Sequence, residues 1–353
     1  MDWSNIDWAA LERLRATFLA GTAGGNDYWQ NEAELASYDA TFAQRIGWKW
    51  DYVLGELQRR GWSPPCGELF DWGCGSGIAG RAFLDAFGAE SVSSLRLWDR
   101  SALAMQFAAK RAVEKYPGLK IETGHIPTPA AETGARTKAS PRPTASPSPG
   151  GEGRGEGGRG FILLISHVVT ELTPPQTEEL LMLAATATAV LWVEPGTYES
   201  SYTLIAIREK LREQFNVVAP CTHQARCGML AAENKRHWCH HFAAPPPGIF
   251  TDGDWSRFAN FTGVDLRDLP LSFLVLDKRP VPPLPPGAAR VIGHPRVYKP
   301  HALLLGCDES GVRERKLTKR ALPEEFKRLR KGDCAPVQVW QSDGDKITDV
   351  SPM

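Results

Sequence analysis

The sequence lacks any apolar run long enough to cross a membrane. A membrane-spanning helix needs about 20 predominantly apolar residues, and no such stretch occurs among the 353 residues. Neither sign of charge dominates, because 41 Lys and Arg residues balance 41 Asp and Glu residues. We therefore predict no membrane partner, and any nucleic-acid contact must come from a local basic patch.

The N-terminal segment has neither the layout of a signal peptide nor that of an Arg-rich transit peptide. It reads Met1-Asp-Trp-Ser-Asn-Ile-Asp-Trp8 and is acidic. We therefore predict a cytoplasmic protein, and we expect it to be a monomer. In the cytoplasm, the seven cysteines favour metal-binding, redox or core roles over disulfide bonds.

Residues 127–160 contain no Val, Ile, Leu, Met, aromatic residue or Cys and are rich in Pro and Gly. Such a segment cannot bury enough apolar surface to offset the entropy lost on ordering. The composition predicts a disordered insertion between the third and fourth strands of a sheet. The alternative is an RNA-binding tail that uses Arg136, Lys138, Arg142 and Arg154.

The stretch around which the chain is organised is Glu68-Leu-Phe-Asp-Trp-Gly-Cys-Gly-Ser-Gly-Ile-Ala-Gly-Arg81. Its pattern predicts a short buried strand, a tight turn through Gly73, Gly75 and Gly77, and a helix over 78–87. Glycines in such a turn let the backbone approach a ligand closely, and the free N–H groups of a helix start favour an anion. The run from Gly75 to Gly80 also fits the dinucleotide-binding pattern.

Asp71 and Asp99 favour S-adenosylmethionine over a dinucleotide. A carboxylate at the strand tip would repel a pyrophosphate, whereas Asp71 could accept the amino group of adenosylmethionine. Asp99 ends a second predicted strand and could accept both ribose hydroxyls. His167 follows a later apolar strand, and strand tips line the ligand crevice in such folds, so it joins the predicted cofactor site. A dinucleotide site and a ligand-free turn remain the alternatives.

From Cys66 onward, predicted strands alternate with helices, which indicates a mostly parallel sheet. The predicted fold class is α/β, with an N-terminal helical region and a small β-rich C-terminal appendage. The order Asp71-x-Gly-x-Gly-x-Gly with Asp99 resembles class I methyltransferases, which implies their Rossmann-like, mostly parallel sheet. The predicted boundaries are 1–62 for the helical region, 63–280 for the methyltransferase-like domain and 287–353 for the basic appendage. A cysteine cluster lies within 219–242.

Three cysteines, at positions 221, 227 and 239, occur in an irregular segment. Their spacing matches no standard zinc finger, although a nearby histidine (His223, His237, His240 or His241) could complete a zinc site. From spacing alone, zinc is the first candidate and an iron–sulfur cluster is the second.

Several blocks in this order resemble the methyltransferase-like small-ribosomal-subunit assembly family, which comprises mitochondrial ribosome factors and bacterial relatives. The blocks are Ala219-Pro-Cys-Thr-His223 with Cys227, Trp238-Cys-His240, Ser166-His-Val-Val-Thr-Glu-Leu172, Val193-Glu-Pro-Gly-Thr197, and Leu303-Leu-Leu-Gly-Cys-Asp-Glu-Ser-Gly311 followed by Lys319. Thr222 and Gly228 stand where the family usually has prolines. The family's tryptophan-rich C-terminal ending is replaced by Lys331-Gly-Asp-Cys-Ala-Pro336.

The resemblance implies a four-iron, four-sulfur cluster held by Cys221, Cys227, Cys239 and Cys307. It also implies a role in small-subunit assembly through ribosomal RNA. The basic residues Arg313, Arg315, Lys316, Lys319 and Arg320 are the predicted RNA contacts.

The chain lacks both the Asn/Asp-Pro-Pro-Tyr motif of amine methyltransferases and the Pro-Cys pair of cytosine-C5 enzymes at the fourth strand. No catalytic residue is assigned, so retained methyl transfer is an open point. The first hypothesis is an assembly factor that binds adenosylmethionine. The alternatives are an active RNA methyltransferase with a structural zinc site and a redox or iron sensor that regulates ribosome binding.

Overall fold

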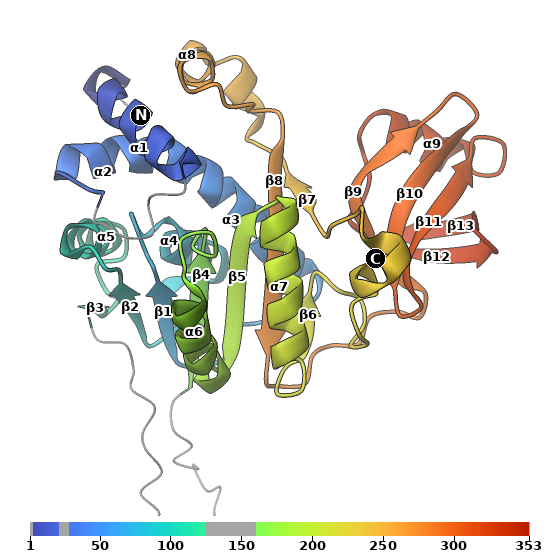
Figure 1. Ribbon diagram of the computed structural model, residues 1–353, viewed down its shortest axis with the longest axis horizontal. Coiled ribbons are helices and arrows are strands. Elements are labelled where there is room, and N and C mark those ends of the chain that lie inside the picture. Colours follow the sequence, from blue (N-terminus) through green and yellow to red (C-terminus); the bar gives the residue numbers. More distant parts are fainter. Residues whose placement is uncertain (1–2, 21–27, 125–159, 353) are drawn as a thin grey trace, which may run out of the picture.

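The computed structural model describes residues 3–20, 28–124 and 160–352. An α/β core and a small β-barrel lie side by side (Figure 1). The predicted disordered insertion lies almost entirely outside the described residues, between the two strands expected to flank it.

The bounds of the elements are as follows. The α-helices are α1 (Trp8–Leu19), α2 (Glu32–Ala40), α3 (Phe42–Arg59), α4 (Ile78–Phe87), α5 (Ala102–Lys115), α6 (Pro174–Thr186), α7 (Tyr198–Leu211), α8 (Gly253–Thr262) and α9 (Pro323–Arg330). The core strands are β1 (Glu68–Trp72), β2 (Ser94–Trp98), β3 (Ile121–Thr123), β4 (Phe161–Ser166), β5 (Ala189–Pro195), β6 (Asn216–Ala219), β7 (His241–Ala243) and β8 (Leu269–Asp277). The barrel strands are β9 (Ala288–Val297), β10 (His301–Asp308), β11 (Gly311–Thr318), β12 (Val337–Asp343) and β13 (Lys346–Pro352).

The core sheet has the strand order β3-β2-β1-β4-β5-β8-β6, and β7 pairs with one end of β8. Strands β1 to β5 run parallel, whereas β8 is antiparallel to both β5 and β6. This order, with one antiparallel strand inserted next to the edge, is that of the class I methyltransferase fold. The predicted fold class is thus confirmed.

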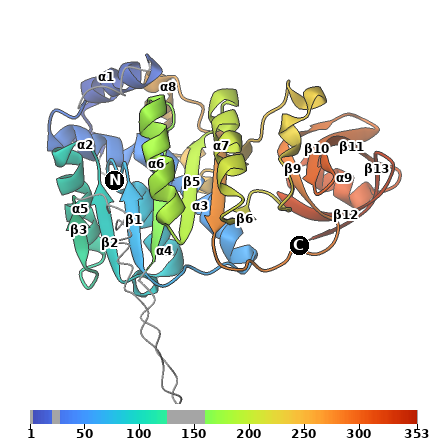
Figure 2. The same cartoon turned by 60° about the horizontal axis from the view of Figure 1, so that its bottom comes forward.

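Helices cover both faces of the sheet (Figure 2). Side chains of α3, α4 and α5 pack on one face, and those of α6 and α7 pack on the other. Strand β4 serves both layers: Ile162 and Leu164 contact the first, Leu163 and Ile165 the second, and all four are 0% exposed. A strand buried on both faces has no need of polar residues, which explains its continuous apolar sequence.

Within the predicted N-terminal helical region, residues 32–59 form two helices, α2 and α3. The break is at Thr41, whose backbone (φ −126°, ψ −86°) leaves the helical region between α2 and α3. Its hydroxyl donates to the Ser37 carbonyl at 2.6 Å. This bond supplies a partner for a carbonyl near the end of α2.

The first helix packs against a segment that lies far away in the sequence. Ile6 and Leu11 share an apolar cluster with Ile249, Trp255 and Phe258 from the region of α8. The N-terminal helices therefore form one cap together with residues inserted between β7 and β8. A sequence boundary at residue 62 separates parts that pack together in space.

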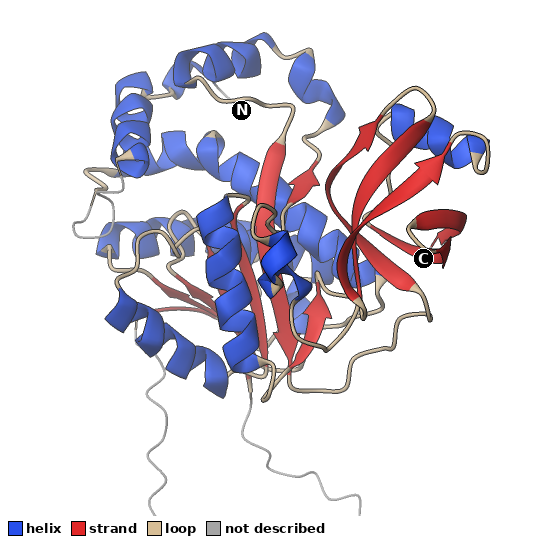
Figure 3. Ribbon diagram, turned by 45° about the vertical axis from the view of Figure 1, so that its right-hand side comes forward, coloured by secondary structure: helices blue, strands red, loops and turns tan. Residues whose placement is uncertain are grey.

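Strands β9 to β13 close a barrel in the order β10-β11-β13-β12-β9 (Figure 3). Leu304 and Leu317 fill its interior together with Phe326 and Leu329 of α9. The predicted β-rich appendage is confirmed. Strands β12 and β13 are hard to recognise in the sequence, because exposed polar residues such as Gln341 interrupt the apolar pattern.

A buried ion network joins the barrel to the core. Glu56 of α3 pairs with Arg60 at 2.8 Å and with Arg290 of β9, and each of the three side chains is at most 3% exposed. Burial alone would lower the pKa of Arg290, but the Glu56 carboxylate reverses this and raises it. Arg290 therefore stays charged, and its charge in turn offsets the free-energy cost of burying the Glu56 carboxylate.

Candidate functional site

The loop after β1 is held by the neighbouring strand. The backbone N–H groups of Gly73 and Cys74 both donate to the Trp98 carbonyl of β2, at 2.8 and 3.0 Å. Gly73, Gly75 and Gly77 all have positive φ, at 70°, 51° and 76°. The predicted turn through these three glycines is present, and α4 begins directly after it.

The three glycines differ in what surrounds them. A Cβ atom at Gly73 would lie 2.9 Å from Val168, and one at Gly77 would lie 2.9 Å from Ala108. A Cβ atom at Gly75 would meet no described atom within 4 Å. Gly73 and Gly77 therefore allow close packing of the protein on itself, whereas Gly75 faces open space.

That open space belongs to a cavity of about 690 Å³. Its floor is formed by the loop and by the carboxyl ends of β1, β2 and β4, where ligands bind in this class of sheet. Its walls also include side chains of the N-terminal cap. The residues that line it include Phe18, Tyr28, Tyr38, Arg45, Lys49, Gly73, Gly75, Asp99, Ser166, His167 and Glu171.

Asp99 is placed on the cavity wall by backbone donors. One carboxylate oxygen accepts from the Gly75 N–H at 2.9 Å, and the other accepts from the Ser101 N–H at 2.9 Å. Both bonds fix the carboxylate at the tip of β2, beside the glycine turn. This is the position that the sequence predicted for a ribose-binding acid.

Asp71 does not lie where the sequence reasoning put it. It is 0% exposed and is not among the described residues that line the cavity. One oxygen accepts from the Gly80 N–H at 3.0 Å, and the other is buried without a partner. Asp71 therefore lies beneath the loop and bonds to the first turn of α4, rather than facing a ligand directly.

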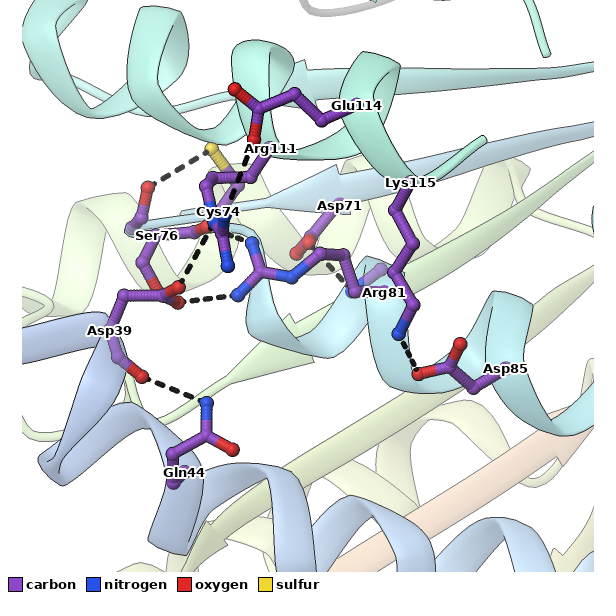
Figure 4. Close-up of polar contacts among 12 residues, drawn as sticks. Asp39, Gln44, Asp71, Cys74, Ser76, Arg81, Asp85, Arg111, Glu114 and Lys115 are labelled. Atoms are coloured by element: carbon purple, nitrogen blue, oxygen red, sulfur yellow. Dashed lines mark hydrogen bonds and ion pairs between the residues drawn. The ribbon is translucent and has the colours of Figure 1, made fainter. Parts of the chain in front are cut away.

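The cap is tied to the glycine loop by Arg81 of α4 (Figure 4). Its guanidinium donates to the Ser76 carbonyl at 2.6 Å and forms a buried ion pair with Asp39 of α2. Arg111 of α5 also reaches Asp39, at 3.4 Å. The cap is thus joined by a buried ion pair to the same arginine that bonds to the loop.

Aromatic side chains of the cap close the cavity over Asp99. Burial is the first cause of the raised pKa values of Tyr28 and Tyr38, and the nearby Asp99 and Glu171 carboxylates raise them further. The Arg100 guanidinium lies 5.2 Å from the Tyr28 ring centre. Sequence reasoning missed both tyrosines: nothing in the helical pattern of α2 indicates that Tyr38 faces a ligand, and Tyr28 lies in the segment before that helix.

The tips of β4 and β5 carry polar groups with incomplete bonding. His167 has a positive φ of 56°, which is unusual for a residue other than glycine, and its Nε2 atom is buried without a partner. Burial lowers the pKa of His167, so the ring is neutral at pH 7. His167 lies on the cavity wall, as predicted.

Glu194 at the tip of β5 was not identified from the sequence. It is 0% exposed, and one of its oxygens accepts from Trp192 at 2.7 Å and from the N–H groups of Val168 and Val169 at 3.1 Å. Burial raises the pKa of Glu194 to about 7. Glu194 therefore shapes the turn after β4, which carries His167.

The second candidate site is the cysteine centre, defined as Cys221, Cys227, Cys239 and Cys307. Cys227 and Cys307 belong to one buried cluster, and Cys239 packs against it. Burial raises the pKa of Cys307, and the other three thiols add to this rise because they lie nearby. The fold thus brings together four cysteines from the core loop and from β10, as the resemblance implied.

Two of the four histidines considered for zinc contact these thiols. The Nε2 atom of His223 lies 3.5 Å from the Cys307 sulfur, and that of His241 lies 3.7 Å from the Cys239 sulfur. His240 instead stacks on Trp238. Within residues 3–20, 28–124 and 160–352, no group of three or more His, Cys, Asp or Glu residues is arranged to hold a single metal ion.

Three buried arginines surround the cysteine centre. Arg60 donates to the carbonyls of Val218 and Cys221 at 2.5 and 2.8 Å, and Arg208 donates to the Ala225 carbonyl at 2.8 Å. Arg290 donates to the Pro220 carbonyl at 3.0 Å. These bonds hold the loop that carries Cys221, and they place positive charge beside the thiols.

The five predicted RNA contacts fall on β11 and the turn that follows it. Arg313, Lys319 and Arg320 are exposed, and Lys316 is partly exposed. Arg315 differs, because its side chain is only 11% exposed, pairs with Asp308 at 3.4 Å and donates to the Gly344 carbonyl at 2.8 Å. Arg315 has a structural contact, which leaves the other four as a solvent-facing basic group.

Comparisons with known proteins give a family and distant structural likenesses. Residues 160–336 match the family model described as mitochondrial small ribosomal subunit Rsm22. No curated protein sequence matches the chain. The solved structures that resemble it include magnesium protoporphyrin IX methyltransferase from Synechocystis PCC 6803 with bound SAM, at 12% identity and a TM-score of 0.36, covering 77% of this chain and 97% of that one.

Another is TrmK of M. capricolum with S-adenosylhomocysteine, at 8% identity and a TM-score of 0.30, covering 65% of this chain and 69% of that one. At such scores, the fold assignment rests on the strand order and directions described above. Within the part of the chain that the structure describes, no helix is both long and apolar enough to span a membrane.

Asp71→Asn should change how stability depends on pH. Burial raises the pKa of Asp71 from its usual 3.8 to about 7. Between these values the folded chain holds a proton that the unfolded chain has lost, so the contribution of Asp71 to stability falls as the pH rises. Asn removes this dependence, so the variant should gain about 2–4 kcal/mol relative to wild type between pH 4 and pH 7.

Chemical denaturation of both proteins across this pH range measures the difference. Asp345→Asn, which changes an exposed carboxylate in the barrel, is the control and should track wild type. A constant difference between Asp71→Asn and wild type over the whole range would show that Asp71 is ionised throughout.

Proposed function

Because the chain belongs to the mitochondrial small ribosomal subunit Rsm22 family, we propose that it acts in assembly of the small ribosomal subunit. In this proposal it binds S-adenosylmethionine in the core cavity, carries a four-iron, four-sulfur cluster on the cysteine centre and contacts ribosomal RNA with the barrel. The observation that carries the proposal is the meeting of four cysteines at the junction of a methyltransferase-type core and a basic barrel.

The cavity suits adenosylmethionine in three respects. Asp99 is held at the tip of β2, where it could accept the two ribose hydroxyls. Gly75 leaves open space beside it for close approach of a ligand. Asp71 supports this loop from beneath, through its bond to Gly80. A pyrophosphate beside Asp99 would meet a carboxylate, so a dinucleotide is the weaker candidate.

When bound, adenosylmethionine would supply a methyl group activated by a sulfonium. Methyl transfer depends largely on how the acceptor is positioned. The proposed assembly role requires cofactor binding but no methyl transfer, and it therefore needs no catalytic residue.

Gly75→Val should abolish adenosylmethionine binding. The branched side chain would occupy the open space beside Asp99 and would strain a backbone with φ of 51°. Isothermal titration calorimetry with adenosylmethionine measures the loss. Gly61→Val is a matched control, because Gly61 also has a positive φ (71°) and open space around it but lies outside the cavity. Tight binding of NAD by wild type, without adenosylmethionine binding, would contradict the proposal.

The cysteine centre suits a four-iron cluster better than a single ion. Each cysteine of such a cluster binds a different iron atom, so the thiols need not converge on one point as zinc ligands must. A cluster held by four thiolates is anionic, and Arg60, Arg208 and Arg290 would offset its charge. Burial raises the pKa of Cys227 to about 11, so without a metal this thiol is protonated at neutral pH.

Each of the substitutions Cys221→Ser, Cys227→Ser, Cys239→Ser and Cys307→Ser should lower the iron and sulfide content of anaerobically purified protein. The cluster's brown colour should fade with them. Cys66→Ser and Cys334→Ser are matched controls outside the centre and should retain both elements. Stoichiometric zinc without sulfide in the wild-type protein would replace the cluster with the zinc alternative.

The basic group of β11 and its turn suits RNA phosphates. Arg313, Lys316, Lys319 and Arg320 form no ion pair with any residue that the structure describes. Further along, Lys327 and Arg328 of α9 pair with Glu324 and Glu325. Unpaired exposed cations bind phosphate at little cost, whereas paired ones must first lose an acidic partner.

Neutralising Arg313, Lys316, Lys319 and Arg320 together should weaken binding to small-subunit precursors. If all four contact phosphates, the slope of log affinity against log salt should fall by about 3. Cosedimentation at several salt concentrations measures both effects. A control variant that neutralises Lys110, Lys115, Lys120 and Lys210 removes equal charge from the core. Equal weakening by the two variants would mean a general charge effect and no specific barrel surface.

A further inference from the structure

Lys49 is a buried basic residue at the cavity whose ammonium group has no partner among the residues that the structure describes. It lies on α3, lines the cavity and is 8% exposed. Its side chain forms no hydrogen bond or ion pair with any residue in the described part of the chain, and its backbone belongs to α3. Burying an ammonium group without a counter-charge is costly, so this position needs an explanation beyond packing.

The neighbours of Lys49 make its position more costly. Arg45 lies one turn earlier on α3 and also lines the cavity. Its guanidinium donates to the Asp265 carbonyl at 3.2 Å, but its Nε atom is buried without a partner. Burial is the main cause that lowers the pKa of Lys49 to about 7; Arg45 adds to this effect, and the Glu194 carboxylate partly opposes it. The third basic group here is His167, whose pKa is lowered in part by Lys49.

The chemistry of Lys49 and Arg45 suits an anion. Two like-charged side chains that face one cavity repel each other, and an anion between them would stabilise both. A carboxylate is a suitable anion, because it can accept from an ammonium and a guanidinium at the same time. The nearby Glu194 is a weak counter-charge for this role. One of its oxygens is bonded to Trp192, Val168 and Val169, the other is buried without a partner, and burial raises its pKa to about 7.

The order of the strands indicates which carboxylate fits. Asp99 ends β2, the glycine loop follows β1, and Trp50, next to Lys49, donates to Ser166 of β4 at 3.0 Å. Since β1 lies between β2 and β4, a ligand whose ribose binds Asp99 crosses the glycine loop and points its other end at Lys49. In adenosylmethionine, that other end is an amino acid with a free carboxylate.

The start of α4 is less suitable for this carboxylate. Its Gly80 N–H already donates to Asp71 at 3.0 Å, and the Gly77 N–H donates to the Cys74 carbonyl at 2.7 Å. We propose that Lys49, supported by Arg45, binds the carboxylate of the cofactor's amino-acid end. This inference rests on the proposed cofactor site and adds the residue that selects a ligand with an amino-acid group.

Calorimetry of the full chain with two ligands tests the assignment. S-adenosylhomocysteine carries the carboxylate, whereas 5′-methylthioadenosine keeps the adenosine and the sulfur but lacks the amino-acid end. Lys49→Met should weaken S-adenosylhomocysteine binding about 10- to 100-fold, the loss expected for a hydrogen bond to a charged group. Binding of 5′-methylthioadenosine should be unchanged.

Two further variants serve as controls. Lys49→Arg keeps the charge and should retain most of the affinity for S-adenosylhomocysteine. Arg59→Met removes a cation from the exposed end of the same helix and should leave both affinities unchanged. Thermal unfolding of Lys49→Met should match or exceed wild type, since the variant loses an unpaired buried charge.

The outcomes separate this assignment from the cofactor proposal. If Lys49→Met binds S-adenosylhomocysteine as tightly as wild type does, Lys49 does not contact the carboxylate and the inference is wrong. Equal weakening towards both ligands overturns it as well, because the effect would then be a change in the shape of the cavity. If wild type binds neither ligand, the cofactor proposal itself fails, and this inference fails with it.

Discussion

The arrangement of the two candidate sites depends on one buried carboxylate, that of Glu56. It pairs with Arg60 on its own helix and with Arg290 of the barrel, and both arginines also bond to the Pro220 carbonyl of the cysteine loop. Because each charge is desolvated, loss of one partner would leave the others uncompensated. Helix α3, the cysteine loop and the barrel are therefore held in one mutual position.

The same helix reaches the cofactor cavity. Gly47 of α3 lies against Ile78 at the start of α4, where a Cβ atom would come within 3.2 Å of the isoleucine side chain. Lys49 and Glu56 are seven residues apart, which is about 10 Å along a helix. Glu56 is paired with two arginines and supports the junction of the domains, whereas the Lys49 side chain has no partner among the described residues and faces the cavity. Burial disfavours the charged form of both side chains. At Glu56 two arginines offset this cost, whereas at Lys49 a ligand that enters the cavity could offset it.

Those parts of the fold that depend on local pattern could be predicted from the sequence. The strand, glycine turn and helix around Gly75 and the placement of Asp99 follow from apolar runs and turn residues. The parts that depend on long-range packing could not be predicted. Asp71 is recognisable as a strand-end acid, yet only the structure shows it beneath the loop, bonded to α4. Likewise, nothing in the pattern of α3 distinguishes Lys49, which is buried at the cavity, from Arg59, which is exposed.

The two departures from the family's cysteine loop have a common structural setting. The Thr222 hydroxyl donates to the Cys307 carbonyl of β10 at 3.4 Å, a bond that proline could not form. At Gly228, a Cβ atom would lie 2.6 Å from the Val312 backbone nitrogen, so glycine lets the loop approach the β10–β11 hairpin closely. Asn234 adds a bond to the Val312 carbonyl at 3.2 Å. Both substitutions thus bring the loop of Cys221 and Cys227 into direct contact with the hairpin that carries Cys307, and the four thiols stay together without the prolines.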